Sequence, residues 1–138
     1  DKLTYAILEE ILRTYLTPIS IHSGNLTMAL FQRTSSKLEK IAEKILKQLS
    51  GKVIKKYAVE IRKTEVEAGS GSLPLEKISS MALVFKDGMK PSELSRKFRM
   101  TSPPVLGYIH GNHFHIDLKA IPPKQEKYLL RVLQEVLV

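Results

Sequence analysis

The sequence contains no cysteine, no internal repeat and no low-complexity segment. The lack of cysteine excludes a disulfide scaffold, a thiolate metal site and a cysteine nucleophile, and it fits a reducing, cytoplasmic compartment. No apolar run approaches the roughly 20 residues that a membrane-spanning helix needs. No segment has the pattern of a signal peptide, so we expect no membrane partner. What remains is a chain of 138 residues, long enough for one core.

Positive charge is in excess. Lysine and arginine number 22 against 14 acidic residues, which gives a net charge of +8. This balance favours contact with nucleic acid or phosphorylated ligands, although many proteins carry as much charge on solvated faces. The chain begins with Asp1, and a helical pattern follows immediately. We therefore expect a segment of a longer protein.

The first third of the chain has one clear helical pattern. Apolar residues recur at helical spacing over residues 2–16, with Asp1 as a potential N-cap and Pro18 as a stop. Residues 17–33 have no regular pattern and are expected to be irregular. A short apolar stretch at 26–31 lies within this irregular part.

The strongest helical pattern covers residues 36–50. Ser36 and Glu39 have the spacing of a capping box, and Gly51 stands where glycine commonly ends a helix. From Val53 to Val66 the period changes to two, which predicts a long strand with one wet face.

The second half predicts a buried strand, a short helix, a hairpin and a last helix. These elements are expected at 79–86, 91–99, 105–119 and from Pro122 onward. Gly111-Asn112 is a suitable two-residue hairpin turn. Its register places the apolar side chains of Phe114 and Ile116 on one face. The opposite face then carries Leu106, Tyr108, His110, His113, His115 and Asp117.

Mostly antiparallel strands with helices on one side predict an α+β fold. We expect a two-layer sandwich in which a sheet of about four strands has helices packed on one face.

Three histidines are candidates for a metal-binding site. His110, His113 and His115 are close together, and Asp117 could serve as a fourth ligand or as a hydrogen-bond partner. Imidazoles on one strand face can bind zinc or nickel. A polar outer sheet face near a hairpin tip is the favoured interpretation, so no metal site is assigned.

Lysines gather in sequence between residues 37 and 63. They are Lys37, Lys40, Lys44, Lys47, Lys52, Lys55, Lys56 and Lys63. Such a cluster could follow a phosphate backbone. Few aromatic residues for base stacking stand nearby and no common RNA-binding motif is present, so a solvated helix face is favoured.

The loop Gly69-Ser70-Gly71-Ser72-Leu73-Pro74 lies between two predicted strands. Its glycines permit positive φ, and successive backbone N–H groups could cradle an anion. The lysine and the helix of a P-loop are missing. By its pattern alone, the loop is more typical of a connection than of a ligand site.

Four motifs in order resemble the C-terminal domain of bacterial selenocysteine synthases, the L-seryl-tRNA(Sec) selenium transferases. The residues that carry the resemblance are 1–4 with 12–16, 26–33 with 36–45, 67–74 with 78–83, and 103–109 with 114–118. The resemblance covers nearly the whole chain. It implies the small C-terminal domain of fold type I pyridoxal phosphate enzymes. It also divides the chain into a helix and linker at 1–33, leading from an absent large domain, and an α+β domain at 34–138.

The resemblance also implies the chemistry of the full-length enzyme. Seryl-tRNA(Sec) becomes selenocysteinyl-tRNA(Sec) by β-elimination and addition, with selenophosphate as selenium donor and pyridoxal phosphate bound to a lysine. That lysine belongs to the absent domain, so no catalytic residue is assigned here and no cofactor is expected on this chain alone. The partners implied are full-length subunits in a homo-oligomer, a decamer in the bacterial family. Within it, Gly69, Ser70, Gly71, Ser72, Leu73 and Pro74 would be candidate walls of the active site.

Two alternatives remain open at this point. The chain could be the small domain of a related pyridoxal-phosphate-dependent lyase acting on small amino acids or sugar acids. It could also be a stand-alone basic RNA-binding module, which would bind tRNA with a steep salt dependence.

Overall fold

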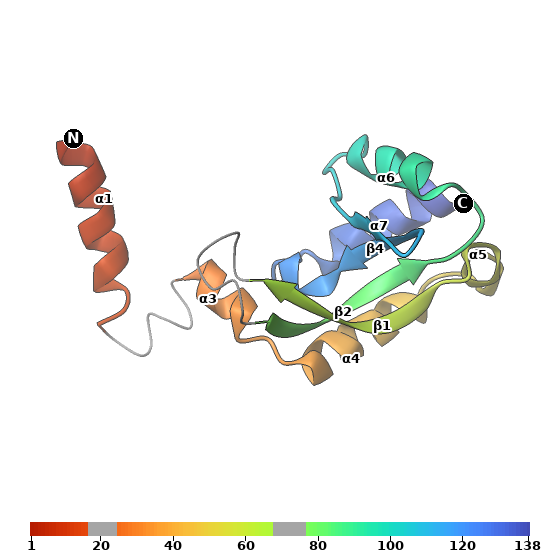
Figure 1. Ribbon diagram of the computed structural model, residues 1–138, viewed down its shortest axis with the longest axis horizontal. Coiled ribbons are helices and arrows are strands. Elements are labelled where there is room, and N and C mark those ends of the chain that lie inside the picture. The colour runs from red at the N-terminus through yellow and green to blue at the C-terminus, as the bar shows by residue number, and fades with distance from the viewer. Residues whose placement is uncertain (17–24, 68–76) are drawn as a thin grey trace. The chain divides into compact units, whose positions relative to one another are not determined.

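The computed structural model describes residues 1–16, 25–67 and 77–138. The chain divides into two compact units, Asp1–Arg33 and Thr34–Val138, which are described separately below. Figure 1 shows the helices of the first unit and the layered sheet and helices of the second.

The first unit contains two helices, α1 (Lys2–Arg13) and α3 (Leu26–Phe31). The predicted N-cap of α1 is confirmed, because the Asp1 carboxylate accepts a hydrogen bond of 3.0 Å from the backbone N–H of Leu3. The helix ends earlier than expected, and residues 14–16 form a turn. No helix among the described residues has the length and apolarity needed to cross a bilayer.

The expectation of irregular structure at residues 26–31 is wrong. Asn25 caps α3 with its side chain, which accepts a hydrogen bond of 3.1 Å from the backbone N–H of Met28. A side-chain acceptor at this position satisfies a free N–H of the first turn. Six residues are too few for helical periodicity to be visible, so the pattern alone could not identify this helix.

The second unit is built on a four-stranded sheet. Its strands are β1 (Glu60–Glu67), β2 (Lys77–Phe85), β3 (Tyr108–His110) and β4 (His113–Asp117). They are ordered β1-β2-β4-β3, and every neighbouring pair is antiparallel. The predicted α+β class with an antiparallel sheet is therefore confirmed.

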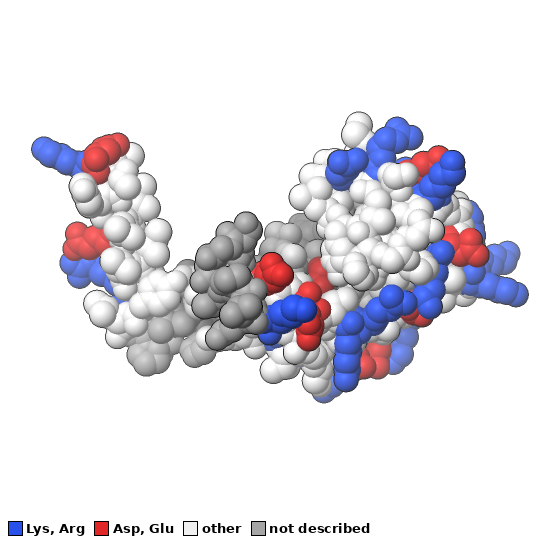
Figure 2. Space-filling model, in the orientation of Figure 1, with Lys and Arg blue, Asp and Glu red and all other residues white. Residues whose placement is uncertain are grey.

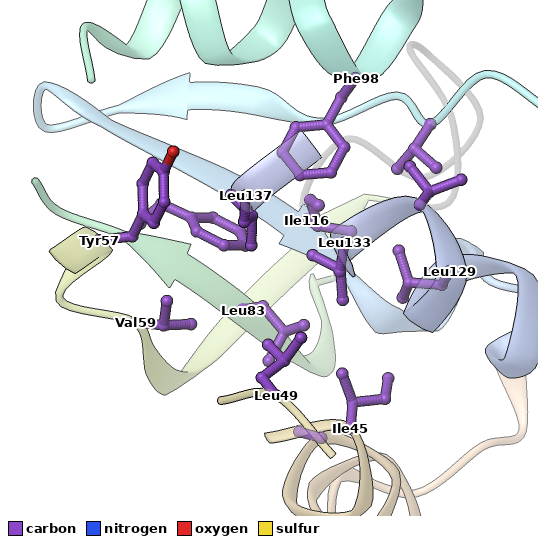
Figure 3. Close-up of a cluster of buried hydrophobic side chains, with 14 of the residues drawn as sticks. Ile45, Leu49, Tyr57, Val59, Leu83, Phe98, Ile116, Leu129, Leu133 and Leu137 are labelled. Atoms are coloured by element: carbon purple, nitrogen blue, oxygen red, sulfur yellow. The ribbon is translucent and has the colours of Figure 1, made fainter. Parts of the chain in front are cut away.

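One sheet face is covered by helices. They are α4 (Ser35–Leu46), α5 (Gly51–Tyr57), α6 (Pro91–Arg99) and α7 (Glu126–Leu137), and a 3-10 turn, η1 (Leu118–Ala120), follows β4. Their apolar stripes meet alternate sheet residues in one core (Figure 3). Core side chains include Leu38, Ile45, Tyr57, Leu83, Phe85, Phe98, Phe114, Ile116, Leu129 and Leu133.

Two expected helix boundaries are wrong in this unit. Thr34, not Ser36, caps α4, since its hydroxyl accepts a hydrogen bond from the backbone N–H of Lys37. Gly51 does not end a helix but begins α5, which Ser50 caps through the backbone N–H of Val53. In both cases a nearby hydroxyl residue provides the N-cap. Thr34 caps α4 two residues before Ser36, and Ser50 caps α5 directly before Gly51.

The long strand predicted from residue 53 begins only at Glu60. Val53 and Tyr57 are both buried, but they are four residues apart on α5, so they share a helix face. Ala58 then adopts a left-handed conformation, with φ of 44°, and ends the helix before the strand starts. This segment is too short for its apolar residues to distinguish the two periods, and tertiary packing selected the helix.

The hairpin prediction is confirmed. Gly111 and Asn112 both have positive φ, 55° and 60°, as a two-residue hairpin turn requires. Ile109 pairs with Phe114, and Tyr108 pairs with His115. Both strands are shorter than expected, and the last helix starts at Glu126 rather than near Pro122.

Candidate ligand-facing sheet surface

The sheet face opposite the helices is called the outer face. Strand register assigns its members, because directly paired residues point to the same side. One row across the sheet is Glu60, Val84, His115 and Tyr108, and the next is Arg62, Ala82 and Asp117. Thr64 and Ser80 form a third row. This face is polar, whereas the helix-covered face is apolar.

Asp117 is the centre of the outer face. One carboxylate oxygen accepts a hydrogen bond of 2.7 Å from the Thr64 hydroxyl, and the other accepts one of 2.6 Å from the Ser80 hydroxyl. The second oxygen also accepts from the backbone N–H of Lys119 at 3.0 Å. Charge-assisted bonds of this kind are stronger than neutral ones. Asp117 therefore connects three strands and accepts three hydrogen bonds from the domain itself.

An aromatic stack lies beside this network. The rings of Tyr108 and His115 are nearly parallel, 18° apart, with centroids separated by 4.9 Å. His110 approaches the His115 ring edge-on at 6.1 Å. His115 is almost fully buried, whereas Tyr108 keeps 40% of its surface exposed. The Tyr108 ring is thus supported on one side and accessible on the other.

The environment shifts two pKa values here. Burial lowers the pKa of His115 below its ordinary value of 6.5, and the charge of Arg62 adds to this effect. Burial also raises the pKa of Tyr108 above 10.0, and the negative charge of Asp117 acts in the same direction. Both side chains are therefore neutral at physiological pH, and His115 can hydrogen-bond through Nε2 with the carbonyl of His110 at 3.3 Å.

Charged groups border the stack. Arg62 donates to Glu60 through Nε and Nη2, and Lys86 contacts the other oxygen of Glu60 at 2.6 Å. The lysine contact is the main cause of the lowered pKa of Glu60, and Arg62 contributes as well. One carboxylate is thereby shared by two cations, which leaves a net positive charge in this group of three.

Two open hollows lie along β1. One of about 310 Å³ is lined by Arg62, Lys63, Thr64, Glu65, Tyr108, His110 and His115. The other, of about 580 Å³, is lined by Ser35, Lys63, Thr64, Glu65, Lys77, Ser79 and Ser80. Both share Lys63, Thr64 and Glu65, so they meet along β1, and the second extends to Ser35 of α4 on the helix-covered side. Charged and hydroxyl side chains line both hollows, which suits a ligand with charged or hydrogen-bonding groups.

The predicted loop residues Gly69 to Pro74 lie outside the described residues. The assignment of Gly69, Ser70, Gly71, Ser72, Leu73 and Pro74 to an active-site wall stays a prediction. Their flanking strands end at Glu67 and begin again at Lys77, two residues that pair with each other.

The three histidines come together on the outer face at the hairpin. His110 pairs directly with His113, and both lie on the outer face with His115. Within residues 1–16, 25–67 and 77–138, no group of three or more histidine, aspartate or glutamate side chains is arranged to hold a metal ion. Asp117 instead accepts hydrogen bonds from hydroxyl groups, so the polar-face interpretation describes it better.

The lysine cluster is spread over α4, α5 and β1, and all eight side chains are exposed. Figure 2 shows positive side chains gathered along the margin of the second unit where these elements lie. Tyr57, the aromatic ring within this stretch, is buried in the core. The cluster is therefore a solvated surface without an aromatic platform of its own.

Sequence reasoning missed the network around Asp117. Thr64 and Ser80 carried no motif, and their partner is 53 and 37 residues away along the chain. The available signal was the alternation over residues 53–66, which predicted a strand with one wet face. Only the pairing of β2 with β4 brings the hydroxyls and the carboxylate together.

Comparison with known proteins decides the family. The family model of L-seryl-tRNA selenium transferases matches residues 1–122. The chain belongs to this family. An L-seryl-tRNA(Sec) selenium transferase of Photorhabdus laumondii is 33% identical over 137 residues, which cover 96% of this chain and 29% of the relative. The enzyme of the same name from Salmonella heidelberg is 29% identical over 88% of this chain and 27% of the relative.

The chain thus spans less than a third of the length of these selenium transferases. The family match extends from α1 to η1 and includes every residue of the outer face named above. The outer face is therefore part of the region that this chain shares with the selenium transferase family.

Proposed function

We propose that this chain is the C-terminal part of an enzyme that converts seryl-tRNA(Sec) to selenocysteinyl-tRNA(Sec) with selenophosphate as selenium donor. The observation that carries the proposal is the family match over residues 1–122, at a length that is under a third of the matched relatives. A whole selenium transferase needs more chain than this one has, so the segment acts within a larger enzyme.

The implied cofactor is pyridoxal phosphate, and the described residues do not fit it. A lysine that forms a Schiff base works as a desolvated amine in a pocket. Apart from Lys119, the described lysines are exposed. Lys119 is buried, but it already has an interaction within the domain. The cofactor and its lysine would therefore belong to other parts of the enzyme, and no chemical step is assigned to this chain.

The contribution of this chain would be a surface beside the active site. The outer face offers hydroxyl groups, a carboxylate that is hydrogen-bonded within the domain and a partly exposed tyrosine. The Gly69–Pro74 loop joins the two strands that carry Arg62, Thr64 and Ser80, so it would extend the same wall. In the full-length enzyme we expect identical subunits to assemble, with aminoacyl-tRNA and selenophosphate as substrates.

A direct test incubates the 138-residue chain with pyridoxal phosphate, seryl-tRNA(Sec) and selenophosphate. We expect no selenocysteinyl-tRNA(Sec), and borohydride reduction should trap no stoichiometric adduct at a single lysine. A trapped adduct together with turnover would contradict the proposal, because it would place the complete catalytic machinery on this chain. The full-length Photorhabdus relative serves as the positive control.

The related lyase is the second candidate function, and nothing in the outer face favours it. The family model and the curated relatives both carry the selenium transferase description. We therefore take the tRNA-linked substrate as the one to test first.

A further inference from the structure

Tyr108 has the form of a stacking platform. Its ring lies almost parallel to His115 beneath it, and 40% of the residue remains exposed. His115 covers one ring face, and Tyr108 also lines the open hollow of about 310 Å³, which is where a base would reach the ring. Aromatic side chains presented in this way on an open antiparallel sheet are a recurrent means of binding unpaired bases in RNA.

His115, which lies beneath the Tyr108 ring, is buried and closely packed. His115 is only 2% exposed, and its Nε2 lies 3.3 Å from the carbonyl of His110. The preceding glycine, Gly107, lies so close to β4 that an added Cβ would stand 2.3 Å from the His115 carbonyl oxygen. A tyrosine held by close backbone packing loses little conformational entropy when a base stacks on it.

Positive charge is available next to the ring. Arg62 lines the same 310 Å³ hollow as Tyr108, and the exposed Lys63 follows it. The guanidinium uses Nε and Nη2 for Glu60, which leaves the Nη1 donors for a further acceptor. Glu60 is shared with Lys86, and Asp117 accepts hydrogen bonds from three donors. Neither carboxylate is therefore left to repel an incoming phosphate at full strength.

A different exposed tyrosine illustrates what a platform requires. Tyr128 on α7 is 41% exposed, almost the same as Tyr108. Its ring already carries two cations, with Lys127 Nζ at 5.0 Å and the Arg131 guanidinium at 5.6 Å from the centroid. Tyr128 thus has nearly the same exposure but already contacts two cations, and it provides a matched control.

We propose that the outer face binds one nucleotide of single-stranded RNA, with the base stacked on Tyr108 and the phosphate contacted by Arg62. This inference rests on the proposed function, under which the nucleotide comes from the unpaired 3′ end of the aminoacyl-tRNA substrate. A hollow of about 310 Å³ has room for one nucleotide rather than for a duplex. The site would hold the end of the tRNA close to the chemistry without touching the amino acid itself.

The experiment measures binding of a fluorescein-labelled single-stranded RNA ending in CCA to the 138-residue chain at low salt. Anisotropy gives the affinity, and tyrosine fluorescence gives an independent signal, since the chain has no tryptophan and five tyrosines. We expect Tyr108→Leu to weaken binding by about tenfold, the usual loss when one stacking contact is removed. Tyr108→Phe keeps the ring and should keep the affinity, while Tyr128→Leu should leave it unchanged.

The outcomes separate the possible binding modes. If Tyr108→Leu and Arg62→Ala bind like the parent chain, or if no RNA binds at all, the proposal is overturned. Loss of binding only in Lys40→Gln and Lys44→Gln would also overturn it, because the RNA would then follow the α4 lysines. Equal weakening by Tyr108→Leu and Tyr108→Phe would show a folding effect instead of stacking and would count against the platform.

Failure of this site differs from failure of the proposed function. An active enzyme carrying this segment, with no effect of Tyr108→Leu on RNA affinity, would remove the nucleotide site alone. Base stacking on Tyr108 in a segment that cannot support selenium transfer would remove the proposed function and leave an RNA-binding surface.

Discussion

The carboxylate of Asp117 on β4 accepts a hydrogen bond of 2.7 Å from the hydroxyl of Thr64 on β1, although β2 runs between these strands. Ser80 on the intervening strand donates to the other oxygen of the same carboxylate. One side chain therefore connects three strands on the face that has no helices over it.

Replacing Asp117 tests this connection. Asp117→Ala should lower the free energy of unfolding by about 2–3 kcal/mol, because it removes charge-assisted bonds and leaves the buried Ser80 hydroxyl without its acceptor. Denaturant unfolding measures the loss. Glu135→Ala, on the exposed surface of α7, should change stability by less than about 0.5 kcal/mol. Equal effects of both substitutions would show that the network contributes no specific stability.

A weaker, pH-dependent contribution is expected from Glu60. Its pKa is lowered from 4.5, first by Lys86 and then by Arg62, so the ionised carboxylate favours the folded state above about pH 4.5. This contribution is lost as the pH falls through the folded-state pKa. Its side chain is 36% exposed, so Glu60→Gln should cost under about 1 kcal/mol at pH 7. A difference between the two proteins that grows on acidification would contradict this assignment.

The buried His115 should make the fold sensitive to mild acid. Burial lowers its pKa in the folded state below 6.5, so the unfolded state binds a proton more readily between those two values. Stability should therefore fall as the pH drops below 6.5 and stop changing, for this group, below the folded-state pKa.

NMR titration of the imidazole measures that pKa directly, and thermal unfolding from pH 7 to 5 measures its consequence. His115→Phe should flatten the pH dependence in this range, while substitution of the exposed His110 by Asn should leave most of it. A pKa of His115 above 6.5 would contradict the account.

Gly107 and Gly51 form a matched pair for backbone packing. A Cβ at Gly107 would lie 2.3 Å from the carbonyl oxygen of His115 and 2.5 Å from the Phe114 ring, whereas one at Gly51 would meet nothing within 4 Å. Gly107→Ala should therefore lower the free energy of unfolding by about 1–3 kcal/mol. Gly51→Ala, at the start of α5, should be neutral or stabilising by up to about 1 kcal/mol. The reverse ranking in thermal unfolding would contradict the close approach of the chain at residue 107.

Elements with strong local signals could be predicted from the sequence. The short helix from Pro91 was expected at its observed bounds, because proline in its first turn and the spacing of Leu94 and Phe98 agree. The hairpin register followed from Gly111-Asn112, since few other residue pairs allow positive φ at two successive positions.

Elements without such signals could not be predicted. The stretch from Val53 to Tyr57 has apolar residues at 53, 54 and 57, and it is too short for either period to be decisive, so burial of Val53 and Tyr57 against the core decided its form. The outer face was foreseen only as a wet surface. Its organisation around Asp117 depends on contacts 37 and 53 residues apart, and no local pattern encodes contacts of that range.

The most direct measurement replaces the matched segment of the Photorhabdus laumondii selenium transferase with this chain and follows selenium transfer to seryl-tRNA(Sec). The relative with the same segment deleted serves as the negative control. Our account predicts that the chimera forms selenocysteinyl-tRNA(Sec) and that the deletion protein does not. A chimera that folds, assembles and binds its cofactor but forms no product would contradict the account.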